Sequence, residues 1–543
     1  MKEDSMSDHD LFSTETAGLM EVGAPRPERL RDGDRLRLAI TPVRKTLDGA
    51  ELRMLAYNGS IPGPTLHVDQ GATITVDVQN DGDVETTVHW HGLRLENRYD
   101  GVPHDTQEPI PVGGRYACQV QFPDPGFYWY HPHIREDFAQ EMGLYGTIVV
   151  DPADAEYWAA VDRELTLTLD DLLLEDGKIA SFSKSGPNFT AMGRFGNVLL
   201  INGETVFSEK ATRGEVVRLY LVNTANTRIF NFAVRGARTK LVGGDSGRYE
   251  HEAFVDEVLL APSERAVLDV LFDTGGEVRL EHRTPDRVYD LGAFSVTQAD
   301  AGEAAATFST LRTDPDLTAE RRALQHDVER SPDKVLAFLS RMPLLYGESE
   351  ATASSYACPM HPDVTASEPG TCPRCGMKLV PSDAAPAPAA EAEADSPHGH
   401  DHGDGLEWED LMPEINRASD PSNMIWQLVD RETGAENGAI SWSFTVGDRV
   451  KIRLVNEMDS DHPMHHPFHI HGAGRFLILA RDGELEQNLV WKDTVLVRAG
   501  ETDDILVDVS NPGLWMAHCH IAEHTESGMM FSFNVARKPE PVR

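Results

Sequence analysis

Ten histidines of this sequence gather in four short motifs, two in the first quarter of the chain and two near its end. Eight of them form His-x-His pairs. Because residues i and i+2 of a strand share one face, each pair directs two imidazoles to one place. Such crowding is costly without a shared cation, and imidazole binds copper well, so the pairs predict bound copper. The motifs are HWHG, HPH, HPFHIHG and HCHIAEHTESGM, with His89, His91, His131, His133, His466, His469, His471, His518, His520 and His524.

The last motif adds a thiol and a thioether. One thiolate, two imidazoles and a distant thioether make a blue-copper electron-transfer site. The flanking His518 and His520 point to the opposite side of the strand from Cys519. Neighbouring Cα atoms are about 3.8 Å apart, so an electron leaving the sulfur reaches these imidazoles through a few covalent bonds. One-electron oxidation is thereby connected to a multi-electron copper site. The predicted blue-copper ligands are His466, Cys519, His524 and, as weak axial ligand, Met529.

Three segments repeat one pattern, a Gly followed by β-branched residues that alternate with polar ones, then Asn. They are GATITVDVQND (71–81), RGEVVRLYLVNT (213–224) and VGDRVKIRLVNE (446–457). A period of two is typical of half-buried strands, and short strands separated by Gly and Pro are typical of β-sandwiches. We therefore predict an all-β chain of three cupredoxin-like Greek-key β-sandwich domains. Their predicted ranges are 30–155, 160–300 and 415–540.

The copies differ in their ligands. The end of copy one, DPGFYWYHPHIREDFAQEMG, aligns with the end of copy three, NPGLWMAHCHIAEHTESGMM. Copy one has Pro132 and Asp137 where copy three has Cys519 and His524, so it cannot build a blue-copper site. Copy two has Asn231 in place of the first histidine pair and no Cys at its end. We predict one electron entry and a second domain without copper ligands.

A small Cys-rich module separates copies two and three. It occupies 356–381, after a linking or helical stretch at 301–350 and before an Ala/Pro/acid tract at 382–414 that we predict to be disordered. Met360 and Met377 adjoin the module's ligands, and thioethers favour Cu(I), so either Cu(I) or structural zinc is expected there. Its ligands have the spacing of a tetrahedral site, and they are Cys358, His361, Cys372 and Cys375.

The acidic tract ends in three alternating histidines, His398, His400 and His402. Imidazoles at this spacing can collect Cu(II), and a solvated linker is the alternative interpretation.

The formal net charge of the 543 residues is −40. This excess of acid argues against binding to nucleic acids or anionic membranes, because such surfaces need Lys and Arg to replace their counterions. The first residues show no basic segment followed by an apolar core, and no run of about 18 apolar residues occurs, so neither a signal peptide nor a membrane span is predicted. We expect a cytoplasmic monomer, and an exported form with a trimmed leader stays open.

The four motifs, in this order and across all three repeats, resemble those of the three-domain multicopper oxidases, which include laccases and bacterial copper-resistance oxidases. The resemblance implies four copper ions, one type 1, one type 2 and two type 3, which couple four one-electron substrate oxidations to the reduction of O2 to water. It implies His89 and His469 as ligands of the type 2 copper. The implied type 3 ligands are His91, His131, His133, His471, His518 and His520. The Cys-rich module resembles the heavy-metal-binding domains appended to copper-efflux proteins.

Reduction of O2 also consumes protons, so acids near the motifs are candidate donors. Asp100, in RYDGVP, follows the first motif where the family has an acid near the type 2 copper. Many bacterial relatives have Glu directly after the last His ligand. This chain has Thr525 there, with Glu526 one step on and Glu523 just before the ligand. Both glutamates are candidate proton relays.

Two electron donors are considered. In the first, Cu(I) is the substrate, the enzyme acts in copper resistance, and the module delivers the ion. Met458, Met464 and His465, just before the third motif, are then a candidate capture site, with ordinary packing as the alternative. In the second, the chain is a laccase that oxidises phenols or aromatic amines in an open apolar pocket beside His524. The module favours Cu(I). A non-catalytic copper-storage protein is disfavoured, because storage has no need of the electron path at Cys519.

Overall fold

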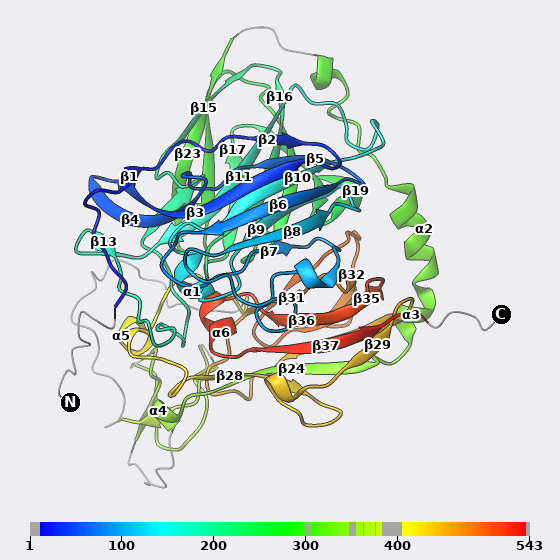
Figure 1. Cartoon of the computed structure of the whole chain (residues 1–543). Helices are drawn as coiled ribbons and strands as arrows, with labels where there is room; N and C mark the ends of the chain where they lie inside the picture. The colour runs from blue at the N-terminus through cyan, green and yellow to red at the C-terminus, as the bar shows by residue number, and fades with distance from the viewer. Residues whose placement is uncertain are drawn as a thin grey trace.

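The computed structural model describes residues 11–298, 303–346, 355–361, 363–374, 376–382 and 404–538. The described chain consists mainly of β-strands in three sandwiches, each with its own apolar core. Figure 1 shows sandwich 1 in blue and cyan, sandwich 2 mostly in green, and sandwich 3 from yellow-green to red. The prediction of an all-β chain of sandwiches is confirmed. No helix among these residues is long and apolar enough to cross a membrane.

Sandwich 1 encloses its core between two sheets of five strands. The predicted repeat strand forms here, because Thr73–Asn80 alternates between half-buried and buried positions along most of its length. The first sheet contains β1 (Met20–Glu21), β3 (Arg35–Leu47), β6 (Thr73–Asn80) and β8 (Arg115–Gln121), with β4 (Ala50–Tyr57) paired to β3. The second has the order β2 (Glu28–Leu30), β5 (Leu66–Asp69), β10 (Gly146–Asp151), β9 (Gly126–His131) and β7 (His89–His91). The short helices η1 (Asn97–Tyr99) and α1 (Glu136–Ala139) follow β7 and β9.

Sandwich 2 repeats this arrangement with longer strands. Its first sheet has the order β14 (Val198–Ile201), β11 (Arg163–Leu172), β16 (Val216–Asn223), β21 (Arg265–Leu271), β18 (Arg238–Gly244) and β19 (Gly247–Val255). The second has the order β15 (Phe207–Thr212), β23 (Val288–Thr297), β22 (Gly276–Arg283), β17 (Phe230–Arg235) and β20 (Val258–Leu260). A small hairpin of β12 (Leu174–Glu175) and β13 (Lys178–Ile179) lies outside both sheets.

Sandwich 3 carries the two C-terminal histidine motifs on one of its sheets. That sheet has the order β29 (Ser443–Thr445), β37 (Met530–Ala536), β36 (Gly513–Cys519), β31 (His466–Ile470) and β34 (Thr494–Val497). The other has the order β28 (Ile425–Asp430), β24 (Lys334–Arg341), β30 (Arg449–Asn456), β35 (Thr502–Val509), β32 (Gly474–Arg481) and β33 (Glu484–Leu485). The helices η3 (Asn437–Ala439) and α6 (Ala522–Glu526) complete it.

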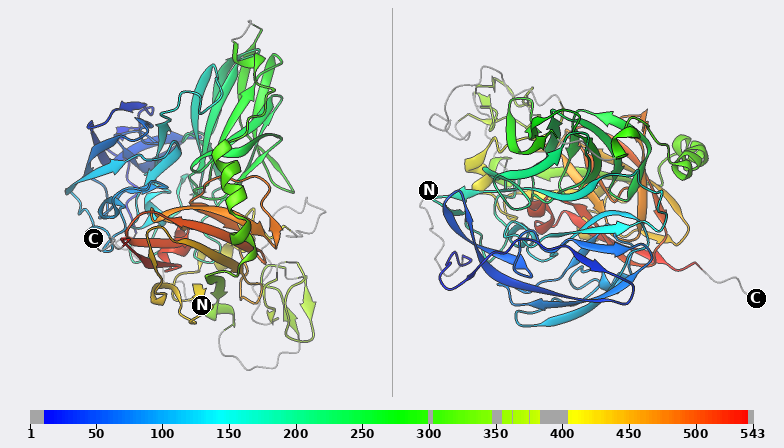
Figure 2. Two further views of the ribbon diagram at one scale, coloured as in Figure 1. Left: turned by 90° about the vertical axis from the view of Figure 1, so that its right-hand side faces the viewer. Right: turned by 90° about the horizontal axis from the view of Figure 1, so that it is seen from above.

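The stretch 301–350, predicted as linking or helical, contains short helices and also a strand. It contains η2 (Glu303–Ala306), α2 (Pro315–Ala323), α3 (Gln325–Glu329) and α4 (Pro343–Tyr346). It also contains β24, which pairs with β28 and β30 inside sandwich 3. β24 is largely buried and does not alternate strictly, so its pattern gave no period-two signal. The Cys-rich module therefore interrupts sandwich 3, and does not lie between domains 2 and 3 as predicted. Helix α2 runs along the outside of the molecule, where Leu317 and Leu324 pack on leucines of sandwich 3 (Figure 2).

The module forms a three-stranded sheet of β26 (Thr365–Ala366), β25 (Tyr356–Ala357) and β27 (Val380–Pro381). The tract that follows was predicted to be disordered over 382–414, and 383–403, with its three histidines, lies outside the described residues. For 404–414 the prediction is wrong. Leu406 and Met412 are buried, and α5 (Pro413–Arg417) starts within it. Burial of these apolar side chains stabilises a fixed conformation in this part of the tract.

Candidate copper centres

Strand pairing brings the histidine pairs of sandwiches 1 and 3 to equivalent places. His89 of β7 pairs with His131 of β9, and His469 of β31 pairs with His518 of β36. The two sandwiches meet at these strands, so the ring centroids of His89 and His469 are 5.8 Å apart. All eight histidines predicted for the type 2 and type 3 coppers are at most 5% exposed. Three sets offer ring nitrogens within 4.8 Å of one another: His89, His469 and His471; His89, His91 and His131; and His133, His471 and His518.

The hydrogen bonds of the rings show which nitrogen is left for a metal. Nδ1 of His89 donates to the carbonyl oxygen of Asp100 (2.7 Å), and Nδ1 of His469 donates to that of Asp493 (2.9 Å). A buried polar atom without a partner is costly, and a shared metal ion removes that cost. The arrangement therefore fits a copper cluster. Within these eight rings, the buried nitrogens without a hydrogen-bond partner are Nε2 of His89, His131, His469 and His518, Nδ1 of His91, and both nitrogens of His520.

Metal binding requires neutral imidazoles, and the surroundings of several of these rings favour that form. Burial, together with the neighbouring imidazoles, lowers the pKa of His91, His469 and His471 well below its usual value. A neutral ring whose one nitrogen donates to oxygen keeps a lone pair on the other. The cluster is thus prepared to bind cations through inward-facing nitrogens.

The predicted blue-copper ligands also meet. Sγ of Cys519 lies 3.4 Å from Nδ1 of His466 and 3.7 Å from Nδ1 of His524. Burial raises the pKa of the Cys519 thiol well above its usual range, so a bound cation is what would keep it as thiolate. The side chain of Met529 is fully buried in the core that contains Cys519, and the Met529 carbonyl oxygen accepts from the Cys519 N–H (3.2 Å).

An indole covers this site. The ring of Trp426, from β28, stacks on His524 with centroids 4.0 Å apart, and its edge faces His466 at 5.0 Å. His524 and Trp426 are both fully buried. The open apolar pocket that the laccase alternative requires beside His524 is therefore replaced by packed side chains.

Sandwich 2 has the same strand register without the ligands. Phe232 pairs with His282 in sandwich 2, as Phe468 pairs with Cys519 in sandwich 3. His282 thus stands in the place of Cys519, and its Nδ1 accepts from the backbone N–H of Asn231 (3.1 Å). Phe230 stands in the place of His466 by the same register.

Of the three candidate proton donors, Asp100 contacts a predicted copper ligand directly. Oδ2 of Asp100 accepts from Nδ1 of His471 (2.8 Å). Glu523 is buried and accepts from Asn226 and Thr227 of sandwich 2, both at 3.2 Å, and burial raises its pKa to about 7. Oε1 of the half-buried Glu526 accepts from the backbone N–H of Glu136 (2.9 Å), which joins α6 to α1.

Glu136 was not among the residues predicted from the sequence. Its Oε1 lies 2.7 Å from Nδ1 of His133, and its side chain is fully buried. The repeat alignment contains the signal, because Glu136 occupies in HPHIRED the position of Glu523 in HCHIAEH. It therefore belongs with the acids that contact predicted copper ligands.

The module brings its own ligands together. Nδ1 of His361 lies 3.7 Å from Sγ of Cys358 and 3.6 Å from Sγ of Cys372. All three side chains are buried. The fourth predicted ligand, Cys375, lies outside the described residues.

The module rests on the loop that leads to the third motif. A Cβ added at Gly376 would lie 2.4 Å from the Met458 methyl carbon and 3.5 Å from the Pro463 ring. Nζ of Lys378 forms an ion pair with Asp461 (2.9 Å). The apolar cores of the module and of sandwich 3 are also continuous, because Cys358, Cys372 and Cys519 belong to one cluster of packed side chains.

Family models match three parts of the chain. Multicopper oxidase models match residues 39–155 and 413–539, and a heavy metal binding domain model matches residues 355–382. The first two matches contain all four histidine motifs, and the third contains the four Cys and His residues of the module. Two multicopper oxidase domains and a heavy-metal-binding domain are therefore present.

The chain is similar to known proteins over most of its length. The chain is 27% identical over 531 residues to an oxidoreductase, OpS5, of Beauveria bassiana, covering 89% of this chain and 78% of that protein. It is 25% identical to copper resistance protein A of Escherichia coli, with 92% of each chain covered. Among solved structures, a multicopper oxidase of Campylobacter jejuni described as a metallo-oxidase has a TM-score of 0.64 at 21% identity, covering 97% of this chain and 99% of that one, which shows the shared fold.

Proposed function

We propose that this chain, a three-domain multicopper oxidase with an inserted heavy-metal-binding domain, takes electrons from Cu(I) and uses them to reduce O2 to water. That it is a copper-dependent oxidoreductase follows from the family models and relatives. The choice of Cu(I) as electron donor, the number of four oxidase coppers and the role of each residue are the proposal.

The predicted ligands form two groups. His466, Cys519 and His524, with Met529, would hold the type 1 copper, and the eight paired histidines would hold the other three. Copper at these places would supply reversible one-electron chemistry and an O2-reducing centre. Cys519 lies between His518 and His520, so the backbone of β36 joins the two centres.

Protons would reach the copper cluster through acids that contact its ligands or lie on the helix beside it. Asp100 would serve one side through its hydrogen bond from His471. Glu526, with Glu523 of the same helix, would serve the other, because Glu526 contacts Glu136, whose carboxylate lies 2.7 Å from Nδ1 of His133. Each of these carboxyls accepts a hydrogen bond, from His471, from Asn226 and Thr227, or from the backbone N–H of Glu136. These bonds orient the carboxyls for proton transfer.

The docked module is the observation that favours Cu(I). Gly376 packs against Met458, and the ring of Pro463, three residues before the proposed type 1 ligand His466, lies 3.5 Å from where a Cβ at Gly376 would be. A soft cation held by Cys358, His361 and Cys372 would thus be retained next to the electron entry. Buried Met360 and Met377 in the same cluster supply the thioether environment that favours Cu(I) over zinc.

The candidate capture residues differ in suitability. Met458 is 44% exposed and touches the module at Gly376, so it is accessible to an arriving ion. Met464 is fully buried. His465 is less suited as a ligand, because its Nδ1 accepts from the backbone N–H of Glu407 (3.1 Å), which places the ring proton of the neutral form on Nε2.

Burial of His524 disfavours the laccase alternative. A phenol needs contact or near contact with a type 1 ligand, and Trp426 occupies that place. Cu(I) arriving along the module does not need a pocket of phenol size.

A double variant, Cys358→Ser with Cys372→Ser, tests the proposal. We expect kcat/KM for Cu(I) at low free copper to fall at least several-fold, because a tethered site raises the effective substrate concentration. The rate with a phenol should stay within about two-fold, because no oxidase ligand is lost. Equal losses for both substrates would identify the module as a structural element. A parent enzyme that strongly prefers the phenol would be a laccase.

A further inference from the structure

An arginine of sandwich 2 reaches the copper cluster that the other two sandwiches build. We infer that Arg265 is a positioning residue for the trinuclear copper cluster, acting through the carboxylate of Asp493 on the ring of His91. The inference rests on the ligand roles proposed above, and it does not depend on which electron donor the enzyme uses.

Asp493 holds two of the predicted ligands at once. Its Oδ1 accepts from Nε2 of His91 (3.0 Å), so the proton of that ring is on Nε2 and the lone pair is on Nδ1. Its carbonyl oxygen accepts from Nδ1 of His469 (2.9 Å), which leaves Nε2 for metal. One residue therefore sets the orientation of a type 3 ligand and a type 2 ligand.

Arg265 holds Asp493 in turn. Nη1 of Arg265 donates to Oδ1 of Asp493 (2.7 Å), and Nη2 donates to Oδ2, which makes a planar two-point clamp. The clamp fixes both the position and the plane of the carboxylate. Arg265 is fully buried and Asp493 is 2% exposed, so the pair is shielded from water.

Arg265 is itself fixed by all three sandwiches. Its Nε donates to the carbonyl oxygen of Phe127 (3.1 Å) in β9, the strand that ends at His131. Its Nη1 also donates to the carbonyl oxygen of Ser263 (2.9 Å), and its backbone N–H donates to Asp245 (2.9 Å). A side chain held at this many points has one available geometry, which is what a positioning role requires.

The glycine of the HWHG motif accommodates the clamp. Gly92 has φ +84°, and a Cβ added there would lie 2.5 Å from Oδ2 of Asp493 and 2.8 Å from Nη2 of Arg265. The ion pair therefore packs directly against the residue that follows His91. This contact is independent of the hydrogen bonds and places the clamp at the copper cluster.

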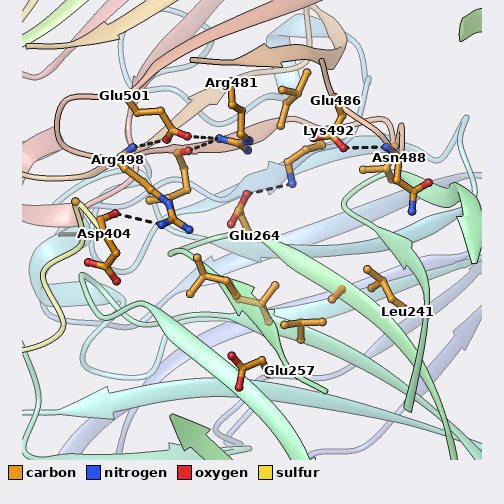
Figure 3. A pocket seen from close by; sticks show the side chains of 18 of the residues that line it. Leu241, Glu257, Glu264, Asp404, Arg481, Glu486, Asn488, Lys492, Arg498 and Glu501 are labelled. Carbon is orange, nitrogen blue, oxygen red and sulfur yellow. Dashed lines mark hydrogen bonds and ion pairs between the residues drawn. The ribbon is translucent and has the colours of Figure 1, made fainter. Parts of the chain in front are cut away.

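The charged residues around Arg265 continue to a cavity of about 850 Å³ between sandwiches 2 and 3 (Figure 3). Lys492, from the wall of the cavity, bonds Asp245 (3.0 Å) and Glu264 (3.1 Å), and Figure 3 shows Lys492 reaching toward Glu264. Asp245 in turn accepts from Arg265. The clamp is thus anchored in sandwich 2 by a network of charges and is not an isolated contact.

The test compares Arg265→Met and Arg265→Lys with the parent holoenzyme. Copper content, the type 2 electron paramagnetic resonance signal, the blue absorption, and the rate at which O2 reoxidises the reduced enzyme are measured. We expect Arg265→Met to lose or shift the type 2 signal and to slow reoxidation about 10- to 100-fold, while the blue absorption stays. The type 2 signal and the reoxidation rate of Arg265→Lys should lie between those of the parent and of Arg265→Met, because an ammonium keeps the charge but not the two-point geometry.

Arg218→Met is the matched control. Arg218 lies in the same sandwich, is 2% exposed, and clamps Asp269 at two points (2.8 and 3.1 Å) away from the predicted copper ligands. It should lower stability and leave the type 2 signal unchanged. A parent-like type 2 signal and reoxidation rate in Arg265→Met would overturn the inference, as would equal spectral changes in Arg218→Met. If Arg265→Met does not fold, Arg265→Lys alone decides by the same readouts. A parent without type 1 and type 2 signals would instead refute the proposed ligand roles.

Discussion

The indole of Trp426 stacks on the imidazole of His524 with ring centroids 4.0 Å apart and planes inclined by 29°. Trp426 Nε1 donates to the carbonyl oxygen of Thr190 in sandwich 2 (2.7 Å), which fixes the indole. The imidazole of His524, a ligand of the proposed electron-entry site, is therefore covered by a side chain that sandwich 2 holds in place. If His524 holds the type 1 copper as proposed, this contact limits what can approach it.

Trp426→Ala should open that site. We expect kcat/KM for a phenol to rise several-fold, because His524 becomes accessible, while stability falls by about 3–5 kcal/mol through loss of a buried aromatic side chain. Trp442→Ala is the control, since Trp442 is buried in the same core and packs on Phe531. It should lower stability without a gain with phenols. A phenol rate unchanged in Trp426→Ala would mean that the indole does not limit access.

Cys519→Ser should abolish the intense blue absorption and reduce oxidase activity to background, because a hydroxyl does not provide the thiolate bond to copper. Cys118→Ser serves as control, since Cys118 is another buried cysteine and its thiol donates to the Val76 carbonyl oxygen at 3.5 Å in sandwich 1. It should stay blue and active. A Cys519→Ser enzyme that still turns over would contradict the electron path.

Lys378→Glu should loosen the module from the body, because it replaces the ion pair with Asp461 by repulsion. We expect kcat/KM for Cu(I) at low free copper to fall a few-fold and the phenol rate to stay unchanged. The matched control is Arg374→Glu, because Arg374 pairs with Asp363 inside the module. If both variants reduce kcat/KM for Cu(I) equally, docking of the module on sandwich 3 does not determine the rate of Cu(I) oxidation.

Acid should weaken sandwich 2 through His282. Burial and the nearby Arg228 lower the pKa of His282 to about 3, from an ordinary value of 6.5. Between these values the unfolded chain binds more protons than the folded one, so the free energy of unfolding decreases as the pH falls from 6.5 toward 3. The contribution is fully present above pH 6.5.

His282→Gln should remove this dependence. The amide can still accept from the Asn231 N–H and does not titrate. Between about pH 6.5 and pH 5 the variant should lose about 2 kcal/mol less stability than the parent, measured by urea unfolding. Parallel stability curves for the two proteins would show that the pKa of His282 is the same in the folded and unfolded chains.

Much of the candidate site could be predicted from local sequence. In HWHG and HCHIAEHTESGM the ligand types are adjacent along the chain, and strand geometry alone determines that residues two apart face the same way. The three repeats predicted the sandwiches for the same reason, because a period of two is a property of each strand. The strand β24 could not be predicted in this way, since a strand buried without strict alternation lacks that period.

Only the tertiary structure decided which distant residues meet. His89 and His469 are 380 positions apart, and they face each other because sandwiches 1 and 3 pack at β7 and β31. The clamp of Arg265 on Asp493 has the same origin, because these two residues belong to sandwiches 2 and 3. The cover of His524 by Trp426 comes from packing within sandwich 3 between segments that are far apart in the sequence. No repeat or motif links these pairs, because the burial of one packed surface against another acts between segments that the local backbone does not connect.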